Sequence, residues 1–248
     1  MLYVRKNIPS PFIYKELGTF PLIVHRLIKI FKYWLKVINL PDTNLVKYIY
    51  NSMVTDLEVD GEIVNWAALV KRMLEKHGLG YLWNHQHLLN KNDITITSLF
   101  KQRIEDIYLQ SINTEIANVS NNRLYKHINS LFVNNAYLDN IKEKYIRVAL
   151  SKFRLGSHNL MIERGRWRKL ELVDRQCFNC GQLDDELHAI TACKLFKNLR
   201  TKYLPKWLYT RPSMYKLIIY MDNVKGNELK NFGIFCHKVL DYIDKNII

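Results

Sequence analysis

Residues 177–193 read Cys-Phe-Asn-Cys-Gly-Gln-Leu-Asp-Asp-Glu-Leu-His-Ala-Ile-Thr-Ala-Cys, which is a C-x2-C-x7-H-x4-C spacing. Two cysteines three positions apart can direct both sulfurs at one ion when the chain turns sharply between them. Gly181 follows the second cysteine and permits the positive φ that such a turn needs. The acidic residues at 184–186 favour a helix start, because they complement the positive end of its dipole. The stretch therefore predicts a small metal-binding knuckle followed by a short helix.

The predicted ligands are Cys177, Cys180, His188 and Cys193. Three thiolates and one imidazole form a closed tetrahedral set, and the softness of sulfur favours zinc over magnesium or calcium. Since all four positions are filled, we expect one structural Zn²⁺ rather than a catalytic metal. A C-x-x-C pair can also be a redox centre, but no βαβ pattern surrounds this one. The fourth cysteine, Cys236, lies on an amphipathic stretch and is expected to be a buried thiol.

Helical periodicity dominates the rest of the chain, with apolar residues at three- and four-residue steps. The clearest helix is expected between Pro21 and Pro41. Others are expected after Asp42 as an N-cap and from Asn65 to a stop at Gly78. The best strand candidate, residues 94–97, is only four residues long. The sequence thus predicts a mainly α protein, a multi-helix array with the small knuckle inserted before a C-terminal helix.

Composition limits the class of protein and its partners. The 248 residues include 37 Lys+Arg against 23 Asp+Glu, a net charge of +14, and 48% are hydrophobic, enough for a folded core. No stretch approaches the roughly 20 apolar residues of a membrane span, and four cysteines are too few for a secreted disulfide scaffold. We expect an intracellular protein with a helical region at 1–140, a basic metal-binding region at 141–211 and a C-terminal helix at 212–248.

Basic residues bracket the knuckle on both sides, and aromatic residues such as Trp167, Phe178 and Trp207 are interleaved with them. Cations attract phosphates, and exposed aromatic rings can stack on unpaired bases, although we expect most of these rings in the core. RNA or DNA is therefore the expected partner, rather than a membrane or a small-molecule substrate. The predicted phosphate contacts are Arg154, Arg164, Arg166, Arg168, Lys194, Lys197 and Arg200. The alternative is a zinc-clipped helical module that binds another protein.

Residues 154–167, Arg-Leu-Gly-Ser-His-Asn-Leu-Met-Ile-Glu-Arg-Gly-Arg-Trp, lead into the knuckle. With Asp185-Glu186-Leu187-His188, this region resembles the zinc-binding C-terminal region of non-LTR (LINE-type) retrotransposon reverse transcriptases. Weaker likenesses upstream, at 14–18, 64–66 and 77–79, extend the resemblance over most of the chain. The resemblance implies the part of a polyprotein that grips template RNA or target DNA near the polymerase, and a nuclear location would suit it.

The chain departs from that family in its acidic residues. Polymerisation needs a pair of aspartates that hold two metal ions, and residues 220–223, Tyr-Met-Asp-Asn, contain only one. The acids that a restriction-like nuclease would need are likewise isolated, as at Asp222 and Glu228. We therefore expect a non-enzymatic remnant, detached from the polymerase.

Overall fold

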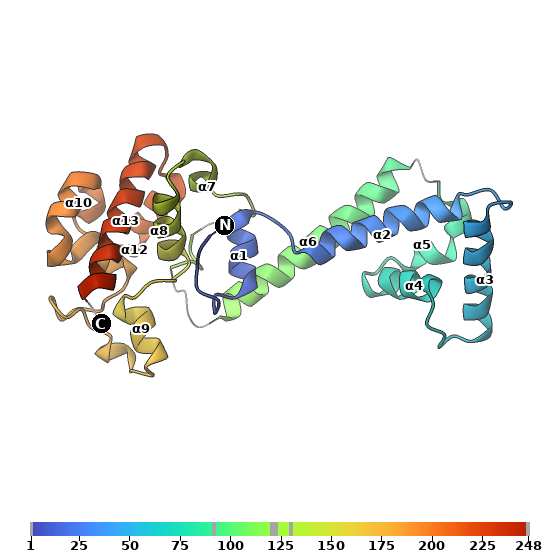
Figure 1. The fold of residues 1–248 in the computed structure, drawn as a ribbon, viewed down its shortest axis with the longest axis horizontal. Helices are drawn as coiled ribbons and strands as arrows, with labels where there is room; N and C mark the ends of the chain where they lie inside the picture. Colours follow the sequence, from blue (N-terminus) through green and yellow to red (C-terminus); the bar gives the residue numbers. More distant parts are fainter. Residues whose placement is uncertain (1, 91–92, 120–123, 129–130, 247–248) are drawn as a thin grey trace. The chain divides into compact units, whose positions relative to one another are not determined.

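The computed structural model describes residues 2–90, 93–119, 124–128 and 131–246, and helices make up most of these (Figure 1). The predicted mainly α, multi-helix architecture is confirmed, and no β-strand is formed by the residues described. No helix in these ranges combines the length and apolarity that crossing a bilayer requires. The chain divides into a central unit, Phe20–Ser111, and a terminal unit that joins Met1–Thr19 to Ile112–Ile248.

Short-range sequence signals determine where the helices of the central unit begin and end. They are α2 (Leu22–Ile38), α3 (Leu45–Val59), α4 (Trp66–Lys76), α5 (Gly80–Asn84) and most of α6 (Ile94–Asn118). The helix predicted between Pro21 and Pro41 is confirmed as α2. The helix predicted from about Asn65 to a stop at Gly78 is confirmed as α4. The Asn65 side chain caps it by accepting a hydrogen bond from the Ala68 N–H, and Gly78 beyond its end has φ +72°.

Two sequence predictions in this unit are wrong. The N-cap of α3 is Asn44, whose side chain accepts from the Val46 N–H, rather than Asp42. The strand candidate at 94–97 forms the first turn of α6 instead. The Asp93 side chain accepts hydrogen bonds from the backbone N–H groups of Thr95 and Ile96, which satisfies two of the free donors of that helix end. The cap outweighs the strand preference of β-branched residues.

Aromatic side chains hold the central unit together. Phe31 on α2 and Phe100 on α6 are fully buried and stack with ring centroids 4.0 Å apart. Trp34 is also buried and donates its indole N–H to the Tyr50 hydroxyl at 2.9 Å. The central unit therefore has a core of its own, in which the Trp34 indole N–H and the Tyr50 hydroxyl are hydrogen-bonded within the unit.

The terminal unit has a separate core in which α8 packs along α13. Its helices are α1 (Ser10–Leu17), α7 (Ala136–Asn140), α8 (Lys144–Arg154), α9 (Met161–Trp167), α10 (Lys197–Tyr203), α11 (Lys206–Tyr209), α12 (Met214–Asn223) and α13 (Gly226–Asn246). Gly233 permits the close approach of α8 and α13, since a Cβ at that position would lie 2.2 Å from a methyl carbon of Ile146. Cys236 is buried in this core, as predicted.

The three predicted segments are distributed over the two units. Residues 1–140 contribute to both units, whereas 141–211 and 212–248 both belong to the terminal unit. The segment 212–248 holds two helices, α12 and α13, because Val224 between them has an extended backbone. The metal-binding sequence lies between α9 and α10.

Candidate metal centre

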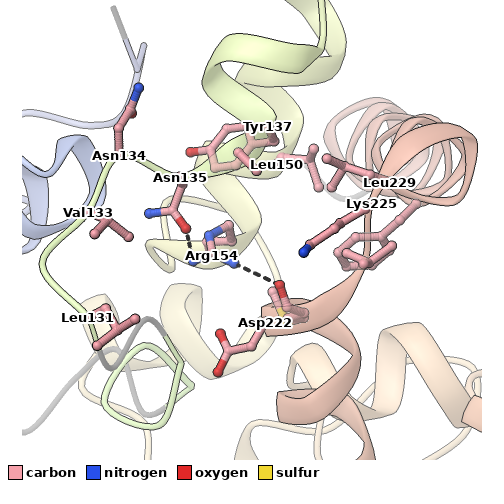
Figure 2. Close-up of a pocket in the computed structure, with 14 residues that line it drawn as sticks. Leu131, Val133, Asn134, Asn135, Tyr137, Leu150, Arg154, Asp222, Lys225 and Leu229 are labelled. Atoms are coloured by element: carbon pink, nitrogen blue, oxygen red, sulfur yellow. Dashed lines mark hydrogen bonds between the residues drawn. The ribbon is translucent and has the colours of Figure 1, made fainter.

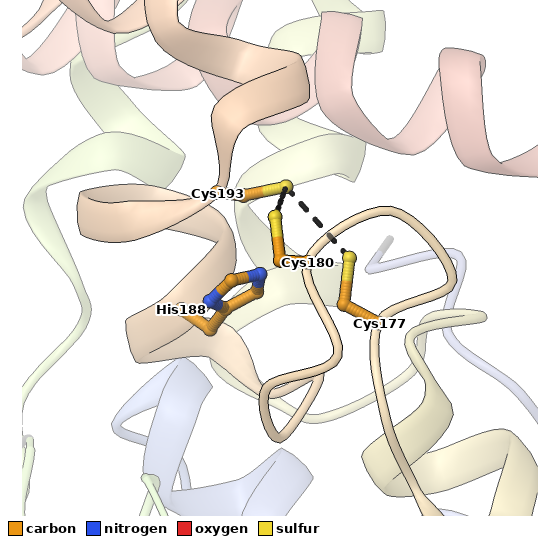
Figure 3. A group of neighbouring side chains, drawn as sticks. All are labelled: Cys177, Cys180, His188 and Cys193. Carbon is orange, nitrogen blue, oxygen red and sulfur yellow. Dashed lines mark hydrogen bonds between the residues drawn. The ribbon is translucent and has the colours of Figure 1, made fainter.

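The four predicted ligands meet at one point of the terminal unit (Figure 3). Their ligand atoms, three Sγ and one imidazole nitrogen, all lie within 4.8 Å of one another. The Cys193 Sγ is 3.9 Å from the Sγ of Cys177 and 3.9 Å from that of Cys180. Residues 16 positions apart in the chain are thus placed so that a single metal ion could contact all four side chains.

A tight turn brings the first two cysteines together. The Gly181 N–H donates to the Cys177 carbonyl oxygen at 2.8 Å, and the Cys177 N–H donates to the Gln182 carbonyl oxygen at 2.7 Å. Gly181 has φ +66°, the left-handed conformation expected from the sequence, which a residue with a Cβ adopts only with strain. The turn folds back on itself and points both sulfurs the same way (Figure 3).

A single wide helical turn of π type, His188–Ala192, begins at His188 and is followed directly by Cys193. The Cys193 N–H donates to the His188 carbonyl oxygen at 2.8 Å, a bond that spans five residues instead of four. In an ordinary α-helix, residues five apart are rotated by about 140° and face away from each other. The wider turn brings the imidazole and the thiol to the same side, so the x4 spacing fits one ion.

The three acidic residues before this turn each have a different role. Asp184 accepts the Met161 N–H at 2.8 Å and so caps α9. Asp185 accepts the His188 N–H at 2.8 Å, which confirms the expected helix start. Glu186 is buried and lies 3.0 Å from the Nε2 atom of His158, which is also buried. The acidic run therefore fastens the ligand-bearing turn to the segment at 158–162.

The protonation chemistry of the cluster suits a metal. Burial lowers the pKa of His188, so the ring is neutral at pH 7 and keeps a lone pair for a ligand bond. Burial raises the pKa of Cys193 to about 12 and also raises that of Cys177. At Cys180 burial acts in the same direction, but hydrogen bonds from Lys194 and Asn179 outweigh it and lower the pKa. A cation would have to displace thiol protons on binding.

Both ring nitrogens of His188 are buried and have no hydrogen-bond partner among the residues described. A buried polar atom without a partner costs about 1–3 kcal/mol, so the arrangement calls for an additional group. A metal ion bound at the cluster would satisfy one of these nitrogens directly. The residues present therefore fit a metal-binding role, and the four free cysteines of the chain include all three sulfur ligands.

Arg200 supports the ligand-bearing turn from α10. The side chain is buried and donates from Nε to the Ile190 carbonyl oxygen at 2.8 Å and from Nη2 to the Cys193 carbonyl oxygen at 2.7 Å. The prediction that Arg200 contacts a phosphate is wrong, because its guanidinium is enclosed by the metal centre's own backbone. Arg200 thus holds the carbonyl groups of Ile190 and Cys193 in place at the end of the wide turn.

Arg154 is the second predicted phosphate contact that the structure corrects. Its side chain is buried at the wall of a cavity of about 320 Å³, beside Asn135 (Figure 2). Its Nε donates to Glu16 at 2.7 Å and its Nη2 to Asn135 at 2.9 Å. Burial by itself would lower the pKa of Arg154, but the Glu16 carboxylate outweighs that effect and raises it. The positive charge is neutralised inside the fold.

The other predicted cations lie nearer the surface. Arg168, Lys194 and Lys197 are exposed, and Arg164 is half-buried. Arg166 is half-buried and pairs with Glu163, its Nη2 lying 2.5 Å from a carboxylate oxygen. The expectation that most neighbouring aromatics are in the core is wrong for three of them. Phe178 is 64% exposed, Trp207 is 46% exposed, and Trp167 is 39% exposed with the Arg5 guanidinium 3.8 Å from its ring centroid.

Comparisons with known proteins returned no match: no family model, no curated protein and no solved structure is similar to this chain. The positions of the side chains described above are therefore the basis for assigning a function.

Proposed function

We propose that this chain binds nucleic acid, and that one structural Zn²⁺ in the Cys177, Cys180, His188 and Cys193 cluster orders the binding surface. The observation that carries the proposal is the attachment of exposed groups to the cluster. The Lys194 N–H lies 3.4 Å from the Cys180 Sγ, and the exposed Phe178 side chain belongs to the turn between two ligands. A lysine whose backbone is held at the cluster and an exposed ring on the same cluster suit a phosphate and an unpaired base.

The distances support zinc as the ion. Two sulfurs bound to a tetrahedral zinc at about 2.3 Å are separated by about 3.8 Å, close to the 3.9 Å between Cys193 and each of the other cysteines. A disulfide would bring two sulfurs to about 2.05 Å. When bound, the zinc would neutralise the thiolates and tie the turn at 177–181 to the wide turn at 188–192.

The proposal includes the resemblance of residues 154–193 to the zinc-binding region of non-LTR retrotransposon reverse transcriptases. On that basis the chain is a part of such a protein that holds RNA or DNA without itself carrying the polymerase centre. The single acid at Asp222 supports the non-enzymatic part of the proposal, because a two-metal site needs a pair. An intracellular, nuclear location follows from the same resemblance.

A salt titration tests the electrostatic part. Binding of the zinc-loaded full chain to a labelled single strand and to a duplex is measured by fluorescence anisotropy over a range of salt concentrations. Replacing Lys194 and Lys197 by Gln is expected to weaken binding to every sequence and to make the single-strand salt slope shallower by about 0.7 per lysine. The matched control is Lys76→Gln, an exposed lysine in the central unit.

Metal removal tests the ordering role. A chelator is expected to weaken binding of the wild-type chain, and added zinc to restore it. Absence of binding to any RNA or DNA at low salt would contradict the proposal and favour the alternative, a zinc-clipped module for a protein partner. Binding that does not respond to chelation would separate the nucleic-acid role from the metal centre.

A further inference from the structure

The α2 helix of the central unit carries a row of exposed cations that the metal centre does not involve. Arg26, Lys29, Lys32 and Lys36 are all exposed, and no acidic residue occurs from residue 17 to residue 41. Their three- and four-residue spacing keeps them on one face of the helix over about 15 Å. The row is long enough to follow more than one phosphate of a nucleic-acid strand.

Charge in the central unit is segregated toward this helix. Residues 20–111 contain 11 Lys+Arg and 9 Asp+Glu, so the unit has a net charge of only +2. The four cations of α2 exceed that net charge, and the remainder of the unit is therefore slightly acidic. A basic face on a nearly neutral unit indicates an anionic partner rather than a general excess of lysine.

A groove of about 410 Å³ opens on the same face. Its described lining residues are Leu22, His25, Arg26, Lys29, Ile30, Tyr33 and Trp66, and none of them is acidic. Tyr33 is 51% exposed and meets Trp66 of α4 edge-on, with ring centroids 5.6 Å apart. The groove thus offers an open aromatic face with two cations farther back along α2, Lys29 about one helical turn before Tyr33 and Arg26 about two turns before it.

We propose that this α2 groove binds an unpaired nucleobase of single-stranded RNA or DNA. The base stacks on the Tyr33 ring against Trp66, while Arg26 and Lys29 contact the flanking phosphates. A groove with an exposed aromatic ring beside two cations suits an unpaired base, whose two faces are free, better than a base pair within a duplex. The groove residues are separate from the metal centre, so the inference goes beyond the proposed function and does not depend on it.

Abasic strands separate stacking from charge. Binding of the full zinc-loaded chain is measured for an oligothymidine strand and for a phosphodiester strand of equal length that lacks bases. Tyr33→Ala is expected to weaken binding to oligothymidine at least about fivefold and to leave binding to the abasic strand unchanged. Lys29→Gln is expected to weaken binding to both strands, because each strand carries the same phosphates.

Matched variants keep the test independent of folding. Tyr33→Phe retains the ring and is expected to bind like wild type. It therefore serves as the reference for Tyr33→Ala, which loses both the ring and its packing against Trp66. Tyr81→Ala removes a tyrosine of similar exposure outside the groove, and Lys76→Gln removes an exposed α4 cation; both are expected to bind normally. Thermal melts of all variants are recorded beside the titrations.

Three outcomes would overturn the inference. Equal binding by Tyr33→Ala and wild type excludes stacking at the groove, and equal losses on abasic and base-bearing strands show that the ring acts only through packing. If the groove variants lose binding to phosphatidylserine vesicles but bind oligothymidine like wild type, the groove binds a membrane surface instead. Normal oligothymidine binding by Cys193→Ser together with losses in the groove variants would contradict the proposed function while supporting the groove.

Discussion

Arg200 supports the candidate metal centre through backbone carbonyl groups. Its guanidinium donates to the carbonyl oxygens of Ile190 and Cys193, and both bonds hold the wide turn that carries two ligands. Arg200→Gln is expected to lower metal affinity about 10-fold or more, in the range seen when residues that support a ligand are removed. Competition with a zinc chelator measures the affinity. Lys202→Gln, an exposed α10 neighbour, is the control, and an equal effect in both variants would contradict this role.

Arg154 and Glu16 form a buried ion pair, and disrupting this pair is expected to change the stability of the fold. Arg154→Met leaves the Glu16 carboxylate buried without its cation, so we expect the free energy of unfolding to fall by about 3–5 kcal/mol. Denaturant titration measures the loss. Adding Glu16→Gln to that variant is expected to recover part of the stability; if it deepens the loss, the pair is not the cause.

Residue types and spacing were sufficient to predict that Cys177, Cys180, His188 and Cys193 come together and that Gly181 is left-handed. The same reasoning failed for Arg154 and Arg200, because a basic residue looks the same in sequence whether it faces solvent or a buried acceptor. Glu16 lies 138 residues from Arg154 in the chain, and the groups that accept hydrogen bonds from Arg200 are backbone carbonyl oxygens. Only the folded arrangement reveals such partners.

At the scale of elements, Gly233 decides how closely α8 and α13 pack. Gly233→Val would place side-chain atoms where a methyl group of Ile146 now lies, and we expect a loss of about 1–3 kcal/mol of stability from overpacking. Urea unfolding is the measurement. Asn231→Val introduces the same side chain on the exposed side of α13, where it changes helix propensity little because Asn and Val are similar helix formers, and serves as control. A similar loss in both variants would show that packing at 233 is not limiting.

Helix positions were predictable where the boundary signals are local. Pro21, Asn65 and Gly78 gave correct limits, since a proline, an amide cap and a positive φ act within one turn of the chain. Residues 94–97 were misassigned because the Asp93 cap outweighs four β-branched residues. The π turn at His188–Ala192 was not predicted, because its geometry follows from bringing His188 and Cys193 to one side rather than from a sequence preference.

At the scale of the whole molecule, positive charge is distributed unevenly. The terminal unit contains 26 Lys+Arg against 14 Asp+Glu, while the central unit is nearly balanced apart from its α2 face. Each unit has its own core, and the four candidate metal ligands all belong to the terminal unit. Loss of the metal is therefore expected to act first on the terminal unit.

Metal content per chain tests the central claim most directly. Mass spectrometry of the intact chain under non-denaturing conditions, after loading with zinc and removal of the excess, is expected to show one zinc per chain. Cys193→Ser is expected to hold none, whereas Cys236→Ser, which changes the one cysteine outside the cluster, is expected to hold one. A wild-type chain that carries no zinc, or a Cys193→Ser chain that carries as much as wild type, would contradict the account.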